Sequence, residues 1–111
     1  MFSFLVLIKE SLSNEMLKDA EDIFKFKFEL DFNNSFSAFS ETYNMRITYK
    51  EDYLKFALFD EEQDAESIKV VQKYFVNCLN GYIRGVFIDR SLDVNKYIFL
   101  REIFDENMII Q

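Results

Sequence analysis

The sequence predicts one α+β domain, residues 1–111, in which two or three helices pack on one face of a mainly antiparallel sheet. Three observations lead to this fold class. The chain has 111 residues, of which 50% are hydrophobic, and this suits a single core. Two segments repeat apolar residues at helical spacing, and several short ones show the apolar runs or the alternation of strands. Their order is β-α-β-β-β-α-β, followed by a segment that fits either a helix or a strand.

The first part of the chain predicts a strand, a helix and a second strand. Residues 2–8 are apolar at nearly every position, so this strand should lie in the centre of the sheet. A helix should begin near Ser13 or Asn14, because either side chain can accept a hydrogen bond from a free backbone amide. Between residues 24 and 32 apolar and charged residues alternate, which predicts a half-buried strand. The buried face of the helix is predicted to consist of Met16, Leu17, Ala20, Ile23 and Phe24.

A polar stretch and a hairpin are predicted next. Residues 33–44 are rich in Ser and Asn and are interpreted as an irregular loop, which is long for a compact domain. Residues 45–50 and 53–60 have the composition of two strands. Only Glu51 and Asp52 separate them, which predicts a tight hairpin turn.

The second half predicts a helix, a strand and one ambiguous segment. Asn80-Gly81 should end the helix, because glycine accepts the left-handed geometry of a helix terminus. Residues 82–89 are strand-like, whereas residues 94–104 fit both a helical face and a buried strand, with the helix preferred. The apolar face of the helix is predicted to contain Ala65, Ile68, Val71, Phe75, Cys78 and Leu79.

The composition argues against the common catalytic and metal-binding sites. The chain has no histidine, so it lacks the usual general base and the commonest metal ligand. Its single cysteine, Cys78, cannot build a zinc site of several Cys and His, and its place on an apolar helical face indicates a structural role. Two glycines cannot supply a glycine-rich phosphate loop. We therefore expect no enzyme, cofactor or metal, with a carboxylate-dependent enzyme as the alternative.

Charge and targeting features indicate the class of partner. A formal net charge of −7 disfavours direct binding to nucleic acid and favours a basic protein partner. The lone cysteine fits a reducing compartment. The apolar residues 2–8 are too few to span a membrane, and no signal peptide is recognised. These features lead us to expect a cytoplasmic protein that does not bind membranes.

Two groups of residues are candidates for partner binding. The first is an acidic run that could face a basic partner: Asp60, Glu61, Glu62, Asp64 and Glu66. Its alternative role is to cap the following helix and complement its dipole. The second group consists of aromatic residues in the predicted loop: Phe36, Phe39 and Tyr43. Equally, these rings could pin the loop to the core, or part of the loop could be an unrecognised strand. A further stripe, Glu15, Asp19 and Asp22, is interpreted as a solvated helix face.

The overall profile resembles that of bacterial toxin immunity proteins, including those of contact-dependent growth inhibition. The resemblance depends on the acidic segment Asp60-Glu61-Glu62-Gln63-Asp64 and on the lack of a catalytic set, and it includes no shared motif. It implies a cytoplasmic inhibitor that covers the active site of a basic toxin domain, often a nuclease. Another acidic interaction protein, such as a secretion chaperone or a nucleic-acid mimic, is the alternative within the binding class.

Overall fold

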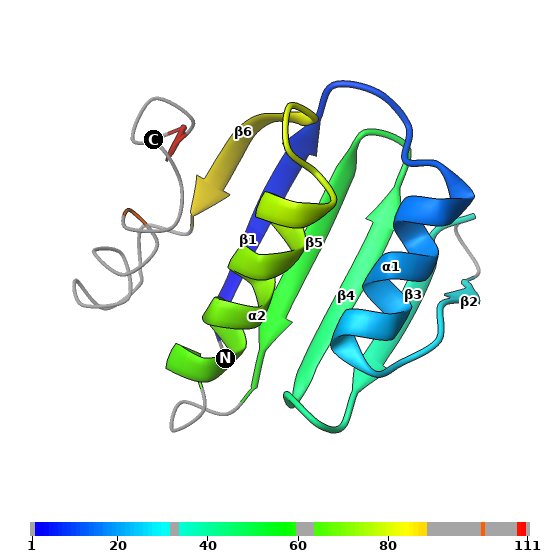
Figure 1. Ribbon diagram of the computed structural model, residues 1–111, viewed down its shortest axis with the longest axis vertical. Coiled ribbons are helices and arrows are strands. Elements are labelled where there is room, and N and C mark those ends of the chain that lie inside the picture. The colour runs from blue at the N-terminus through cyan, green and yellow to red at the C-terminus, as the bar shows by residue number, and fades with distance from the viewer. Residues whose placement is uncertain (1, 32–33, 60–63, 89–100, 102–108, 111) are drawn as a thin grey trace.

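The computed structural model describes residues 2–31, 34–59, 64–88, 101 and 109–110. These residues form an α+β structure, as predicted, in which the helices lie side by side on one face of a seven-stranded sheet (Figure 1). The elements in chain order are β1 (Phe2–Ile8), α1 (Asn14–Phe24), β2 (Glu29–Leu30), β3 (Phe36–Ser40), β4 (Met45–Lys50), β5 (Tyr53–Leu58), α2 (Asp64–Asn77), β6 (Ile83–Ile88) and β7 (Ile109–Ile110).

The sheet has the strand order β2-β3-β4-β5-β1-β6-β7. Its neighbouring strands are antiparallel except for β6 and β7, which pair in parallel. The apolar strand β1 lies between β5 and β6, so its predicted central position is confirmed. The elements β1, α1, β4, β5, α2 and β6 follow the β-α-β-β-α-β order of the ferredoxin-like, split βαβ motif. Strands β2 and β3 extend this arrangement at one edge.

Aromatic rings fill the core between the sheet and the helices. Phe56 of β5 is fully buried, and its ring stacks on that of Phe4 in β1 with the centroids 5.1 Å apart. The ring of Phe75 from α2 meets the same ring edge-on at 5.6 Å, and that of Phe24 from α1 lies at 6.2 Å. Because such pairs contribute about 0.5–1.5 kcal/mol beyond their buried area, this cluster joins both helices to the centre of the sheet.

Helix α1 begins as predicted and ends in a way that corrects one predicted strand. The Ser13 hydroxyl accepts a hydrogen bond from the Met16 amide at 3.2 Å, and Lys25 ends the helix in the left-handed conformation with φ of 61°. The chain then turns, and the Phe28 amide donates to the Glu21 carboxylate at 2.8 Å. The predicted strand over residues 24–32 is therefore wrong for residues 24–28, because Phe24 completes the helix and the chain turns after it, and it is confirmed at Glu29–Leu30, while residue 32 lies outside the described residues.

The hairpin and the strand after the second helix are confirmed. Strands β4 and β5 pair from Met45↔Leu58 to Lys50↔Tyr53, and β6 covers most of the predicted segment. Helix α2 ends at Asn77, earlier than predicted. Gly81, with φ of 86°, lies instead in a turn that the Tyr82 amide closes by donating to the Leu79 carbonyl at 2.9 Å.

The predicted core face of α2 is largely confirmed, with one correction and one addition. Ile68, Val71, Phe75 and Leu79 are buried, but Cys78, just after the helix, is only half-buried. Tyr74, which the sequence pattern missed, is buried between the helices and donates its hydroxyl hydrogen to the Met16 carbonyl at 3.0 Å. The ambiguous segment over residues 94–104 falls, except for Arg101, outside the described residues.

Candidate functional site

Strand β3 occupies the middle of the predicted loop. Residues 36–40 pair with β4 from Phe36↔Tyr49 to Ser40↔Met45, so an irregular loop over residues 33–44 is wrong for this part. Because strand side chains alternate between faces, Phe36 and Phe39 lie on opposite faces of the sheet. Phe36 lies on the helix side, where its ring stacks with that of Tyr49 at 6.4 Å. The three predicted aromatic anchors therefore do not form one patch.

Phe39 belongs to an exposed aromatic pair on the open face of the sheet, the face opposite α1 and α2. Its ring lies 5.9 Å from that of Phe59, and the two side chains are 39% and 42% exposed. The Arg46 guanidinium lies 5.5 Å from the centre of the Phe39 ring and donates to the Ser37 hydroxyl at 3.1 Å. A cation over an exposed ring contributes about 0.5–1 kcal/mol, so the ring is held in place before any partner arrives.

Tyr43 is held by its backbone in the turn between β3 and β4. Its amide donates to the Ser40 hydroxyl at 3.3 Å, and its carbonyl accepts a hydrogen bond from the Ser67 hydroxyl at 3.0 Å. Ser67 lies in the first turns of α2 and is buried. The side chain of Tyr43 is half-buried against the core. Its principal role is thus to join this turn to α2.

The acidic run is described only in part. Asp64 is the first residue of α2, and Glu66 is exposed in its first turn. Asp60, Glu61 and Glu62 fall outside the described residues. Phe59, which directly precedes the run, donates its amide hydrogen to the Asn44 carbonyl at 3.0 Å. Phe59, one member of the aromatic pair, is therefore the residue directly before the acidic run in the sequence.

Four residues lie where β3 and β5 end and α2 begins, and we call them the β3–α2 site: Phe39, Tyr43, Phe59 and Glu66. The aromatic pair lies on the open face of the sheet, whereas Glu66 lies on α2, on the other side. They gather at one end of the molecule, where the turn after β3 and the start of α2 lie in Figure 1. The site includes two of the three predicted aromatics and one predicted acid, but not Phe36. Phe59 is not among the residues predicted from the sequence, although its alternation with Lys55 and Ala57 of β5 indicates the same open face.

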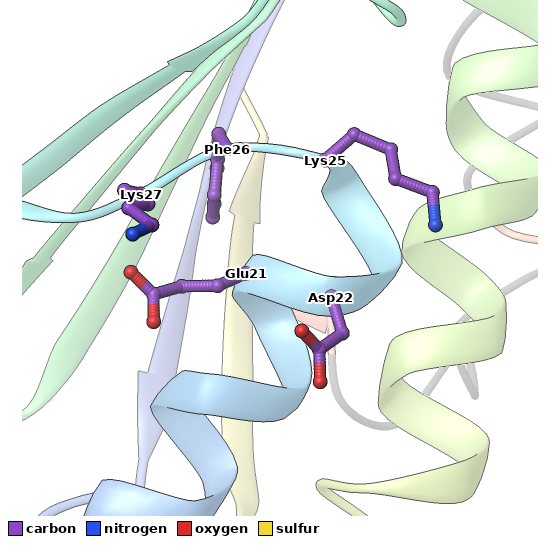
Figure 2. Close-up of a pocket in the computed structure, with 5 residues that line it drawn as sticks. All are labelled: Glu21, Asp22, Lys25, Phe26 and Lys27. Carbon is purple, nitrogen blue, oxygen red and sulfur yellow. The ribbon is translucent and has the colours of Figure 1, made fainter.

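A shallow hollow lies at the end of α1 (Figure 2). It is lined by Glu21, Asp22, Lys25, Phe26 and Lys27, with the two lysines on opposite sides. The Glu21 carboxylate accepts the Phe28 amide hydrogen, so it stabilises the turn after the helix. Opposite charges, an engaged carboxylate and an open shape make this hollow a poor binding site.

The two titratable residues with shifted pKa values near the interface between the helices, Cys78 and Tyr74, have structural roles. Burial, and then the nearby Asp19 carboxylate, raise the pKa of the Cys78 thiol, so the thiol stays protonated at neutral pH. Burial likewise raises the pKa of Tyr74, whose hydroxyl is already a hydrogen-bond donor to Met16. Within the described residues, no cluster of three or more His, Cys, Asp or Glu could hold a metal ion.

Comparison with known protein families, curated proteins and solved structures found no match for this chain. Of the helices that the structure describes, none is long and apolar enough to cross a membrane.

Proposed function

We propose that this chain is a binding protein of the toxin-immunity type, which acts in the cytoplasm by covering the active site of a basic toxin domain. The observation that carries the proposal is the exposed Phe39–Phe59 pair at the end of the sheet where α2 begins with acidic residues. An apolar anchor next to negative charge suits a partner whose active site is a basic cleft. A nuclease that binds a polyanionic substrate is the partner class expected.

The aromatic pair supplies the expected binding free energy. Covering the parts of Phe39 and Phe59 that are still exposed should contribute about 1 kcal/mol each. Interface energy is concentrated in a few well-packed aromatic and arginine side chains, and Arg46 already positions the Phe39 ring. Little ordering entropy is lost on binding when the anchor is held in advance.

Negative charge near the pair supplies the expected rate of encounter. Glu66 and the neighbouring Glu41, in the turn after β3, are both exposed. Such local excess charge accelerates association with a basic protein, and salt weakens the effect.

The test is to isolate the partner and then measure the rates of binding. The untagged chain is purified from its native host, and the proteins that co-purify are identified. Association with the main partner should slow as ionic strength rises, whereas dissociation should change little. The double variant Glu41→Gln/Glu66→Gln should slow association and flatten this salt dependence.

The matched control is Glu10→Gln/Glu15→Gln, which removes the same amount of charge from two exposed side chains just before and at the start of α1, away from the β3–α2 site. A control that slows association equally shows that only net charge matters and that the β3–α2 site is wrong. If the partner is acidic, or if association does not respond to salt, the electrostatic mechanism fails. If no protein partner is found, the immunity-type function fails with it.

A further inference from the structure

The strands of this acidic protein carry no acid except at the edge strand β2. Strands β1, β3, β4, β5 and β6 contain no Asp or Glu, although the chain has 20 such residues among 111. The side chains of Arg46, Lys50 and Lys55 alternate with the buried positions of β4 and β5, so they lie on the open face. The described part of this face is therefore positively charged, opposite to the molecule as a whole.

An apolar stripe runs beside these cations. Leu5 and Leu7 of β1 are half-buried on the open face, and Phe87 of β6 is 44% exposed. The strand registers place Leu5 opposite Phe87 on one side and opposite Lys55 on the other. A row from β6 to β5 thus passes directly from aromatic to aliphatic to cationic side chains.

The size of this surface limits what can cover it. From β4 to β6 the sheet is about 14 Å wide, and six-residue strands are about 20 Å long, which gives about 300 Å². A stable complex of two folded proteins buries about 800 Å² on each partner. A helix of about 13 residues is about 20 Å long and about 10 Å wide, so a single helix fits this area. Two copies packed face to face would instead bring like charges together.

We infer that the open face binds an acidic amphipathic helix of a partner protein. The apolar side of that helix would cover Leu5, Leu7 and Phe87, and carboxylates along its flank would meet Lys50 and Lys55. Charge complementarity selects the acidic helix, since strands β4, β5, β1 and β6 offer cations and no acid on this face, and the acid Glu29 lies apart at the edge strand β2. A nucleic acid is disfavoured because the chain carries a formal net charge of −7, which repels a long polyanion.

This surface lies on the same open face as the Phe39–Phe59 pair but uses other side chains, and it does not depend on the proposed function. The probes are two synthetic helical peptides with the same leucine stripe, one flanked by Glu and the other by Lys. Fluorescence anisotropy with the full chain should show binding of the Glu peptide and none of the Lys peptide. The variant Lys55→Glu should weaken binding of the Glu peptide about tenfold or more, as expected for reversing one charge in a close pair.

The matched control is Lys69→Glu, an identical charge reversal at an exposed position of α2 on the other side of the sheet, and it should leave binding unchanged. Circular dichroism of both variants checks that they fold, and Phe87→Ser provides a second, uncharged test of the same face. The inference is overturned if the Lys peptide binds equally, if Lys55→Glu has no effect, or if the Glu peptide does not bind at about 1 mM. It is also overturned if a single-stranded oligonucleotide displaces the Glu peptide, which would make the face a nucleic-acid site. Self-association that Lys55→Glu abolishes would identify a second copy as the occupant.

Discussion

The buried hydroxyl of Ser67 in α2 donates a hydrogen bond to the carbonyl of Tyr43, 24 residues earlier in the chain, at 3.0 Å. This bond joins the turn after β3 to the first turns of α2, and it fixes the distance between the aromatic and acidic parts of the β3–α2 site. Ser67 is 1% exposed, so its hydroxyl is shielded from water in the folded chain.

Replacing Ser67 by alanine should therefore destabilise the fold. The change leaves the Tyr43 carbonyl without this donor, and we expect the free energy of unfolding to fall by about 1–2 kcal/mol. Urea unfolding followed by circular dichroism measures the difference. Ser11→Ala, at an exposed position, is the control and should change stability by less than about 0.5 kcal/mol. Equal effects of the two substitutions would show that the buried bond contributes nothing.

Phe56 in β5 and Phe59 just after this strand allow a comparison of a core position with an exposed one. Phe56→Ala removes the ring that contacts both helices and β1, and it should cost about 3–5 kcal/mol of stability. Phe59→Ala, at a position 42% exposed, should cost less than about 1.5 kcal/mol. Thermal and urea unfolding of both variants give the comparison. A larger loss from Phe59→Ala would contradict the position of the core.

Gly81 provides a test of backbone geometry alone. A Cβ atom added there meets no atom within 4 Å, so Gly81→Ala should be penalised only by its φ of 86°. We expect a loss of about 1 kcal/mol, and a smaller loss for Gly81→Asn because asparagine tolerates the left-handed region better. Denaturant titration of both variants checks the order. If alanine is as stable as glycine, the turn adopts another conformation.

The reactivity of Cys78 should depend on Asp19. Burial and the Asp19 carboxylate raise the thiol pKa, so modification by iodoacetamide near neutral pH should be slower than for a free thiol and should accelerate as pH rises. Asp19→Asn removes the nearby charge and should move the pH–rate profile to lower pH. Asp22→Asn, an exposed neighbour on the same helix, should leave the profile in place.

The same raised pKa has a consequence for stability. The neutral thiol is favoured by the fold, so its contribution is complete below the ordinary thiol pKa of about 8.5 and is lost as pH rises through the higher folded value. Stability of the parent chain should therefore fall more between neutral and strongly alkaline pH than that of Cys78→Ala. Parallel pH dependence in the two proteins would show that the thiol is not perturbed.

Binding of the partner should distinguish Phe39 from Phe36. The two rings are similarly exposed, at 39% and 37%, on the same strand but on opposite faces. Phe39→Ala should raise the dissociation rate of the partner about tenfold or more, as expected for a buried aromatic anchor, and Phe36→Ala should change it little. Surface plasmon resonance measures both rates. A larger effect at Phe36 would move the binding surface to the helix side of the sheet.

Local sequence signals predicted the elements whose stability is local. Ser13 caps α1 where the pattern indicated, and the two-residue turn at Glu51 and Asp52 joins β4 to β5. The continuous apolar run of β1 correctly indicated a strand with neighbours on both sides. In each case the residues that decide the structure lie within a few positions of one another.

The wrong secondary-structure predictions concern segments whose conformation depends on contacts with residues elsewhere in the chain. Strand β3 has Ser and Ala in place of most strand-forming residues, and pairing along β4 provides the hydrogen bonds that its composition does not suggest. The alternation after Phe24 resembles a strand, but the left-handed Lys25 and the Glu21–Phe28 hydrogen bond turn the chain. For the site, the sequence named Phe39, Tyr43 and Glu66 without showing that the Ser67–Tyr43 bond connects them or that Phe36 faces away.

The central position of β1 affects how the protein is made. The ribosome releases this strand before both of its neighbours, which are β5, at residues 53–58, and β6, at residues 83–88. Pairing on the two sides of β1 must therefore wait until β5 and then β6 have been synthesised, while the β4–β5 hairpin can form locally as soon as it emerges. During that interval the segment FSFLVLI is an unpaired apolar strand of high β-propensity, the kind of segment that drives aggregation of nascent chains. Fast synthesis and prompt pairing of β5 with β1 therefore shorten the time during which the nascent chain can aggregate through this segment.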